Sequence, residues 1–294
     1  MSDVMSRVAG APITWGVDGS PGWGHLMDVN RVLAEMQEVG LHATELGPDG
    51  YLPTDPDELR VMLESYGLVL VGGFVPALLY REDAAEAQLD YVARAARTLA
   101  GCGSEVIVLG PSSHFDGYDH SVNMTEEEWA IFLTNLQKVI DIANAEGLAT
   151  SLHQHWGMAI ERPEHIDRLL ADSDVEFCLE TGHLFLGGAD AVEVAKAAKG
   201  RVSHVHLKDV DGQMAERVRS GELPFRQSVI DGIFKPLGAG DVDITGFITE
   251  LEGSGYDGWY VLEQDLVLDE DPAEGEGPIA DARTSLEYLR RAFA

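Results

Sequence analysis

The sequence predicts an α/β fold, a single (β/α)8 TIM barrel that spans residues 1–294. Eight short β-like runs alternate with eight helical patterns, and the composition does not shift as it would at a domain linker. Eight such units in 294 residues favour a closed barrel over a doubly wound sheet. In residues 201–210, RVSHVHLKDV, apolar and polar side chains alternate as on a strand, and a barrel would aim one set at its interior.

The expected strands are short runs that are either apolar or alternating. The first, VAGAPITWG, ends at Trp15-Gly16 and leads into a loop rich in glycine and proline. The third, LVLVGGFV, is nearly all apolar, which is typical of a strand that is covered on both faces. In chain order, we expect strands at 8–16, 42–46, 68–75, 105–109, 148–153, 175–181, 201–209 and 259–264.

The expected helices carry recognisable start and stop signals. Asp28 and the pair Asp55-Pro56 are typical N-caps, and Thr125 with Glu128 has the spacing of a capping box. Glycines follow several of the helical patterns, as at Gly40. We expect helices at 28–39, 55–66, 82–100, 125–146, 163–171, 190–198, 244–251 and 279–293. An insertion at about 210–241, after strand seven, is expected to hold short helical pieces.

Charge and composition exclude several classes of function. The formal charge is −31, from 20 Lys plus Arg against 51 Asp plus Glu, and it would repel a nucleic acid or an anionic membrane. No glycine-rich nucleotide motif follows the first strand, and no window approaches about 18 uninterrupted apolar residues. Cys102 and Cys178 form neither a disulfide framework nor a CxxC motif, so we expect a reduced, cytoplasmic setting. We expect a small-molecule substrate, and a homo-oligomer stays open.

Polar side chains gather where the expected strands end, which is where the active site of a barrel lies. Five of the ten histidines fall at the ends of strands five to seven. Imidazole and carboxylate donors that converge from neighbouring strands suit a divalent ion such as Mn²⁺, Co²⁺, Mg²⁺ or Zn²⁺. The residues at the strand ends are Trp15, Glu45, His153, His155, Glu180, His183, His206, Lys208, Glu263 and Asp265.

Each of these residues has a structural alternative to a role in chemistry. His206 and Glu263 are expected as metal ligands, and Glu180 is an ionisable group in an apolar strand, which is costly to bury unless it is paired or coordinated. His204 is expected to be a hydrogen-bonded histidine deeper in the barrel or a group behind a ligand. Lys208 could take part in catalysis or contact substrate, or it could merely pair with Asp209 or with a carboxylate behind the ligands.

The remaining aromatic and histidine residues are expected to be less central. Trp15 and Trp156 are interpreted as core or pocket walls rather than as reacting groups. Five histidines are interpreted as surface or loop residues: His25, His42, His114, His120 and His165.

Several runs make the chain resemble the inosose dehydratases, enzymes of the xylose isomerase-like TIM barrels, which also include ketose 3-epimerases and 3-dehydroshikimate dehydratases. The runs HVHLKD and ETGH are shared across that superfamily, whereas HQHWG together with FRQSVIDGIFKPLGAG points more narrowly to the dehydratases. The resemblance covers the chain nearly end to end. Its runs are APITWGV (11–17), LHQHWGMAIERPEHIDRLL (152–170), ETGHLFLGG (180–188), HVHLKDV (204–210), FRQSVIDGIFKPLGAGDVD (225–243) and YDGWYVLEQD (256–265).

The resemblance implies a set of site residues. The four implied metal ligands are His153, Glu180, His206 and Glu263. His183 matches a histidine that contacts substrate oxygens, and His155 matches a second active-site histidine of the dehydratases. Two positions depart from the wider pattern: Glu180 stands where aspartate is usual, and His153 stands where the epimerases have glutamate.

The resemblance also implies a reaction, the metal-dependent dehydration of 2-keto-myo-inositol (scyllo-inosose) through an enediolate in inositol catabolism, with Mn²⁺ or Co²⁺ favoured. Glu263, His153 or His155 would be the base, and His183 or His155 a general acid with a pKa near the working pH. Trp15 and Trp156 would wall the pocket, and Glu45 and Lys208 would contact hydroxyls. The alternative is a sugar or sugar-phosphate isomerase or epimerase with the same metal site; phosphodiester cleavage and a metal-free binding barrel are weaker alternatives.

Overall fold

The structure, a computed structural model, describes residues 4–293. Within them, nine parallel strand segments form one sheet in the order β3-β2-β1-β11-β8-β7-β6-β5-β4. They are β1 (Val8–Gly10), β2 (Ala43–Glu45), β3 (Val69–Gly72), β4 (Phe74–Ala77), β5 (Val106–Pro111), β6 (Ala149–His153), β7 (Glu176–Glu180), β8 (Val202–Leu207) and β11 (Tyr260–Leu262). The predicted barrel is confirmed.

The two outer members of that order, β3 and β4, are halves of the single strand predicted at 68–75. The strand is interrupted at Gly73, so that β3 pairs with β2 and β4 pairs with β5. The backbone N–H groups of Leu46 and Val108 donate to the carbonyls of Gly72 and Gly73, which closes the ring. A β-carbon at Gly73 would lie 2.9 Å from that of Leu46, so glycine permits this close approach.

The first predicted strand was too long. β1 ends at Gly10, and Pro12–Trp15 forms a 3-10 helix, η2, because Pro12 has no N–H to donate to a ladder. A second 3-10 helix, η1 (Val4–Arg7), precedes β1. No helix was predicted at α6 (Thr181–Leu186), a short helix that begins directly after Glu180.

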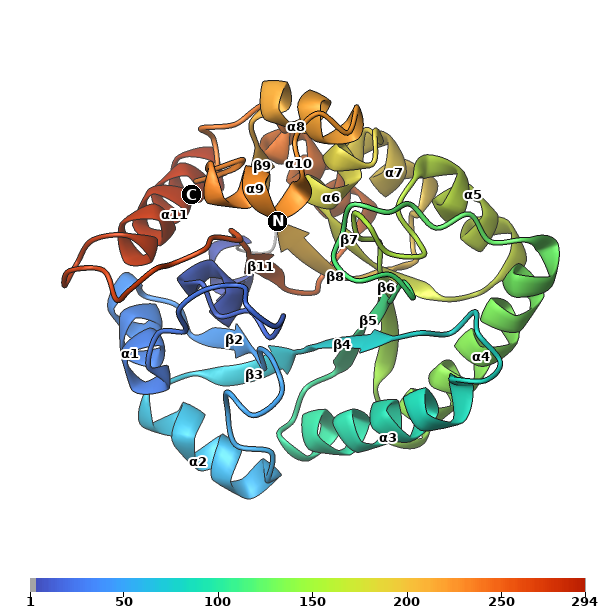
Figure 1. Cartoon of the computed structure of the whole chain (residues 1–294). Coiled ribbons are helices and arrows are strands. Elements are labelled where there is room, and N and C mark those ends of the chain that lie inside the picture. The colour runs from blue at the N-terminus through green and yellow to red at the C-terminus, as the bar shows by residue number, and fades with distance from the viewer. Residues whose placement is uncertain (1–3, 294) are drawn as a thin grey trace.

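Within residues 4–293, eight helices lie around the barrel, as Figure 1 illustrates. They are α1 (Val29–Val39), α2 (Pro56–Ser65), α3 (Ala85–Gly101), α4 (Glu126–Ala145), α5 (Pro163–Asp172), α7 (Ala191–Ala197), α10 (Ile244–Ser254) and α11 (Pro278–Phe293). The predicted caps are confirmed: Asp28 and Asp55 accept backbone N–H groups, and Thr125 with Glu128 forms the capping box. Among the described residues, no helix is long and apolar enough to cross a bilayer.

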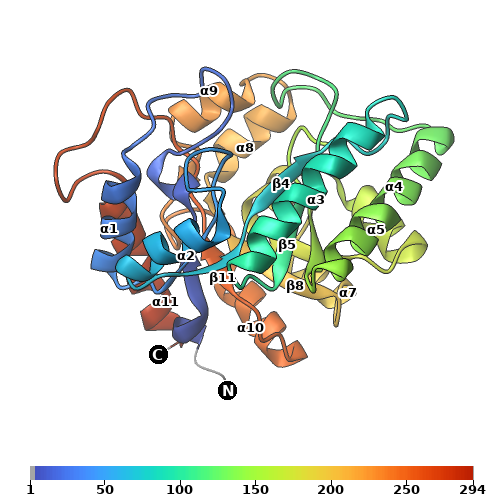
Figure 2. The same ribbon diagram turned by 90° about the horizontal axis from the view of Figure 1, so that it is seen from below.

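The predicted insertion folds over one end of the barrel. It holds α8 (Gly212–Arg219), α9 (Phe225–Ile230) and β10 (Phe234–Lys235), and β10 pairs antiparallel with β9 (Asp209–Val210). Figure 2 shows α8 and α9 at one end of the molecule and α10 at the other. The backbone N–H of Phe225 donates to Asp119, and Arg226 donates to the carbonyl of Trp23, which ties α9 to two other loops.

Asp209 fixes both ends of this insertion. Its buried carboxylate accepts backbone N–H groups from Val210 at the start and from Gly238, Gly240 and Val242 at the end. Hydrogen bonds to a charged group are stronger than neutral ones, and leaving the donors unpaired adds a desolvation cost. Asp209 therefore holds the base of the insertion closed.

We expect Asp209→Ala to lower the free energy of unfolding by about 3 kcal/mol, because several buried N–H groups lose their acceptor. Urea denaturation measures the loss, and limited proteolysis should cut first within 211–237. The matched control is Asp211→Ala, which removes the N-cap of α8 and should cost about 1 kcal/mol. Equal losses in the two variants would contradict the anchoring role.

Candidate active site

The structure brings the four predicted metal ligands together. His153 ends β6, Glu180 ends β7, His206 lies on β8 and Glu263 follows β11. One donor atom from each lies within 4.8 Å of the others. In the sheet, Glu180 is in register with His206, so that the two side chains project from neighbouring strands at the same level. The cluster therefore follows directly from the parallel register of the barrel.

The cluster has the chemistry of a divalent metal site. It offers two imidazoles and two carboxylates, and three of its members are almost fully buried. Nδ1 of His206 and Nδ1 of His153 are buried and find no hydrogen-bond partner within residues 4–293. A buried nitrogen without a partner is costly, and coordination to an ion would satisfy it. The donor set fits a divalent ion.

Protonation of the ligands also suits a cation. Burial raises the pKa of Glu263, but His206 and Lys208 outweigh burial and hold that pKa well below its usual value. Burial lowers the pKa of His206, but Cys178, Glu263 and Glu45 together raise it well above its usual value. A proton on His206 would occupy the nitrogen that a cation needs, so metal binding would release that proton.

His155 and His183 form a close pair beside the predicted ligands, with ring centroids 3.6 Å apart and ring planes tilted by 38°. Nδ1 of His155 lies 2.6 Å from the carbonyl oxygen of Trp156, so this nitrogen carries the proton and Nε2 keeps its lone pair. The backbone N–H of Trp156 donates to Nδ1 of His183, whose Nε2 lies 3.2 Å from Glu180 Oε2. Their backbone contacts therefore give the two rings opposite tautomers.

The expected pKa near the working pH is wrong for this pair in the metal-free protein. Burial lowers the pKa of His155 to about 3, and burial also holds the pKa of His183 well below its usual value. Both rings are neutral at pH 7. The depth of the pair, which depends on the insertion and the loops above it, was not visible in the sequence.

Aromatic side chains that the sequence reasoning missed enclose the pair. Phe74, Tyr118, Phe225 and Phe234 have ring centroids 4.9 to 6.3 Å from His155 or His183. Phe225 and Phe234 both lie in the run 225–243 that carried the resemblance, and this was the available signal for those two rings. Four rings around two imidazoles give the site apolar walls.

Lys208 is buried and lies among carboxylates rather than beside Asp209. Its Nζ is 2.7 Å from Asp265 Oδ1, 3.1 Å from Glu263 Oε2 and 3.4 Å from Glu180 Oε2. Burial lowers the pKa of Lys208, but these carboxylates raise it well above its usual value, so the ammonium keeps its charge. Burial raises the pKa of Asp265 to about 7. The pairing with Asp209 is excluded, and substrate contact by Lys208 stays a prediction.

Glu45 and Trp15, two other predicted substrate contacts, have protein partners in the structure. Glu45 Oε1 is 2.7 Å from Nε2 of His204 and 3.0 Å from Nε2 of His206, so it sits behind a ligand. Trp15 is fully buried in the core and donates its indole N–H to Glu35. Direct contact of Glu45 or Trp15 with substrate stays a prediction, as does the wall formed by Trp156, which is half-buried beside His183.

The interpretation of the outer histidines held for four of the five. His42, His114 and His120 are exposed and His25 is half-buried, but His165 is buried in the first turn of α5. Its Nδ1 accepts the backbone N–H of Glu161. The prediction that His165 lies at the surface or in a loop is wrong, because this histidine is buried and accepts a backbone hydrogen bond at the start of its helix. His204 is hydrogen-bonded to Glu45, as expected.

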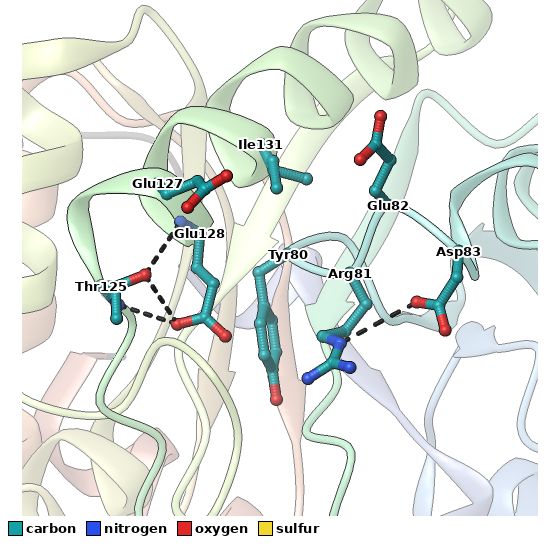
Figure 3. Close-up of a pocket in the computed structure, with 8 residues that line it drawn as sticks. All are labelled: Tyr80, Arg81, Glu82, Asp83, Thr125, Glu127, Glu128 and Ile131. Carbon is teal, nitrogen blue, oxygen red and sulfur yellow. Dashed lines mark hydrogen bonds and ion pairs between the residues drawn. The ribbon is translucent and has the colours of Figure 1, made fainter.

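A separate hollow of about 650 Å³ opens between the segment before α3 and the start of α4. Figure 3 shows charged side chains around it, with Arg81 paired to Asp83 and Thr125 bonded to Glu128. None of the four predicted metal ligands is among its lining residues. The hollow is therefore distinct from the strand-end cluster.

Comparisons with known proteins agree with this geometry. The family model described as xylose isomerase-like TIM barrel matches residues 33–292. An inosose dehydratase of Geobacillus kaustophilus (strain HTA426) is 32% identical over 97% of this chain and 94% of its own. The rhizopine catabolism protein MocC of Rhizobium meliloti is 30% identical over 98% of this chain and 89% of its own.

Solved structures show the same fold at low identity. The IOLI protein with a binding zinc atom aligns with a TM-score of 0.73 at 16% identity, over 98% of this chain and 99% of its own. An L-ribulose 3-epimerase aligns with a TM-score of 0.72 at 16% identity, over 98% and 94%.

The neutral state of His155 predicts a pH dependence of stability. Its folded pKa of about 3 lies below the ordinary value of 6.5, so the unfolded chain binds up to one more proton as the pH falls from about 6.5 toward 3. We therefore expect the stability of the metal-free protein to fall with acidification less steeply in His155→Gln than in wild type. Urea denaturation between pH 8 and pH 4 measures both slopes.

The range from pH 7.5 to pH 8 is the internal control, because a histidine of ordinary pKa is already neutral there and the slopes should coincide. Parallel slopes over the whole range would contradict the neutral state of His155.

Proposed function

The chain belongs to the xylose isomerase-like TIM barrel family, and on that premise we propose that it is a divalent-metal-dependent hydro-lyase that dehydrates 2-keto-myo-inositol (scyllo-inosose). The observation that carries the proposal is the cluster of His153, Glu180, His206 and Glu263 beside a pair of neutral imidazoles. A relative named inosose dehydratase, 32% identical over nearly the whole chain, supports the choice of substrate.

The four ligands would hold one ion, with Mn²⁺ or Co²⁺ favoured for two imidazoles and two carboxylates, and Mg²⁺ and Zn²⁺ as alternatives. A bound ion supplies Lewis-acid stabilisation of the negative charge that develops on the ketone oxygen when the adjacent carbon loses its proton. Glu180 and Glu263 would neutralise part of the ion's charge. Lys208, already surrounded by carboxylates, would hold two of those carboxylates in place.

His155 is the better base of those considered. Its Nδ1–H donates to a backbone carbonyl, which leaves a lone pair on Nε2, and it is not one of the four proposed ligands, whereas Glu263 and His153 would be held by the ion. His155 would take the proton from carbon and return it to the departing hydroxyl, so that water leaves and the enzyme ends in its starting protonation state. His183 would orient that hydroxyl, and the four aromatic rings would exclude bulk water.

The wider assignment follows the same premise. We propose that residues 1–294 form one domain, and that the enzyme serves inositol catabolism in the cytoplasm, which the two free cysteines support. The strong negative charge supports a neutral small molecule rather than nucleic acid or an anionic membrane as partner.

The first test gives scyllo-inosose to protein reconstituted with Mn²⁺ or Co²⁺. We expect metal-dependent loss of one water, followed by the ultraviolet absorbance of the diketone product and by NMR at the carbonyl positions. Metal-free protein is the control. No reaction with metal bound would overturn dehydration and favour an isomerase or epimerase, for which a panel of free and phosphorylated ketoses is the next test.

The second test removes single ligands. We expect His206→Ala and Glu263→Ala each to weaken metal binding by more than about 100-fold, beyond the usual effect of a residue behind a ligand, with the fold intact by circular dichroism. Elemental analysis after dialysis measures the bound ion. His120→Ala, at an exposed histidine, is the matched control. A ligand variant that keeps one ion per chain would refute the assignment.

A further inference from the structure

Glu45, on β2, contacts the proposed ligand His206 but is not one of the four proposed ligands. We propose that Glu45 is a positioning residue, which with His204 fixes the ring of His206 so that its Nδ1 faces the ion. The inference rests on the proposed metal site, because it assigns a role only if His206 is a ligand. It gives a function to two buried ionisable groups that the proposed reaction does not use.

The carboxylate of Glu45 accepts from two histidines of one strand. His204 and His206 are two residues apart on β8, so both side chains point into the barrel. Oε1 of Glu45 lies 2.7 Å from Nε2 of His204 and 3.0 Å from Nε2 of His206. A carboxylate oxygen only accepts, so both of these nitrogens carry the proton. His204 thus holds the oxygen that in turn holds His206.

This contact decides which nitrogen of His206 is free. With the proton on Nε2, the neutral ring keeps its lone pair on Nδ1. That atom lies 3.3 Å from Glu263 Oε1 and has no hydrogen-bond partner within residues 4–293. A histidine that donates one N–H to a carboxylate while its other nitrogen ligates a metal is a common arrangement, and it raises the basicity of the ligand.

The absence of a side chain at Gly72 leaves space for the carboxylate of Glu45. Gly72 is paired with Glu45 in the sheet, and a β-carbon at Gly72 would lie 3.2 Å from Glu45 Oε1 and 3.4 Å from His204 Nε2. Any larger residue would press on the bond between the two groups.

A second ion is the competing explanation, because Glu45, His204 and His206 also offer donor atoms within 4.8 Å of one another. Here, however, both histidine nitrogens already lie at hydrogen-bond distance from one carboxylate oxygen. No buried donor atom of these three residues is left without a partner on that side; the one orphan, Nδ1 of His206, faces Glu263. The contacts therefore favour a hydrogen-bonded support over a second site.

The experiment compares the affinity and stoichiometry of Zn²⁺ binding in wild type, Glu45→Gln and Glu45→Ala by titration calorimetry. We expect one ion per chain, about 10-fold weaker binding in Glu45→Gln, which keeps an acceptor oxygen, and up to about 100-fold weaker binding in Glu45→Ala. The matched control is Glu35→Gln, a buried carboxylate on α1 that bonds Trp15 and Arg31, and its affinity should equal wild type.

A second readout separates positioning from general damage to the fold. In ¹⁵N-histidine NMR of the Zn²⁺-loaded protein, Nε2 of His206 should carry a slowly exchanging proton in wild type and in Glu35→Gln, and lose that protection in Glu45→Ala. Glu45→Gln keeps the shape of the side chain, so it serves if the alanine variant does not fold.

The outcomes are distinguishable. If wild type binds no divalent ion, the proposed function and this inference both fail. If wild type binds one ion and both Glu45 variants keep its affinity and the His206 signal, only this inference fails. If wild type binds two ions and the Glu45 variants bind one, the residue is a ligand of a second site and the positioning role is refuted.

Discussion

Burial of like charges at the ends of β7, β8 and β11 is the constraint on which the site depends. Glu180, Glu263 and Asp265 all contact one ammonium, that of Lys208, in a region nearly closed to solvent. An uncompensated carboxylate in such surroundings costs several kcal/mol. The metal-free protein relieves this cost by a raised pKa at Asp265 and Glu180 and by a proton on His206. A divalent ion would relieve it without those adjustments.

Much of the fold could be predicted because barrel topology follows from periodicity. The alternation of His204 and His206 between Val205 and Leu207 is enough to place both imidazoles inside, and the parallel register then brings Glu180 beside His206. The interruption at Gly73 could not be predicted, because it depends on the close approach of Leu46, which follows the neighbouring strand β2. Periodicity specifies which face a residue occupies, but it says nothing of close approaches between strands.

The residues of the strand-end cluster were predictable from the sequence, but the surroundings of Glu45, His155 and His165 were not. Each of these depends on a partner far away in sequence or on depth below the surface. Glu45 meets β8 at a separation of 159 residues, and the pKa of His155 is set by burial beneath loops and the insertion. Tautomer and protonation state are properties of the assembled site, and a single strand pattern does not encode them.

The end of β8 links the site to the segment that covers it. Lys208 and Asp209 are neighbours of opposite charge, yet they do not pair: Lys208 turns to the carboxylates of the site, and Asp209 turns to the backbone at the base of the insertion. A shift of the strand register by one residue would exchange the positions of the two side chains. Asp209 would then be buried among carboxylates, and the Lys208 ammonium would lie among backbone N–H donors. The alternation that directs Lys208 and the predicted ligands into the barrel therefore also directs Asp209 to the base of the insertion.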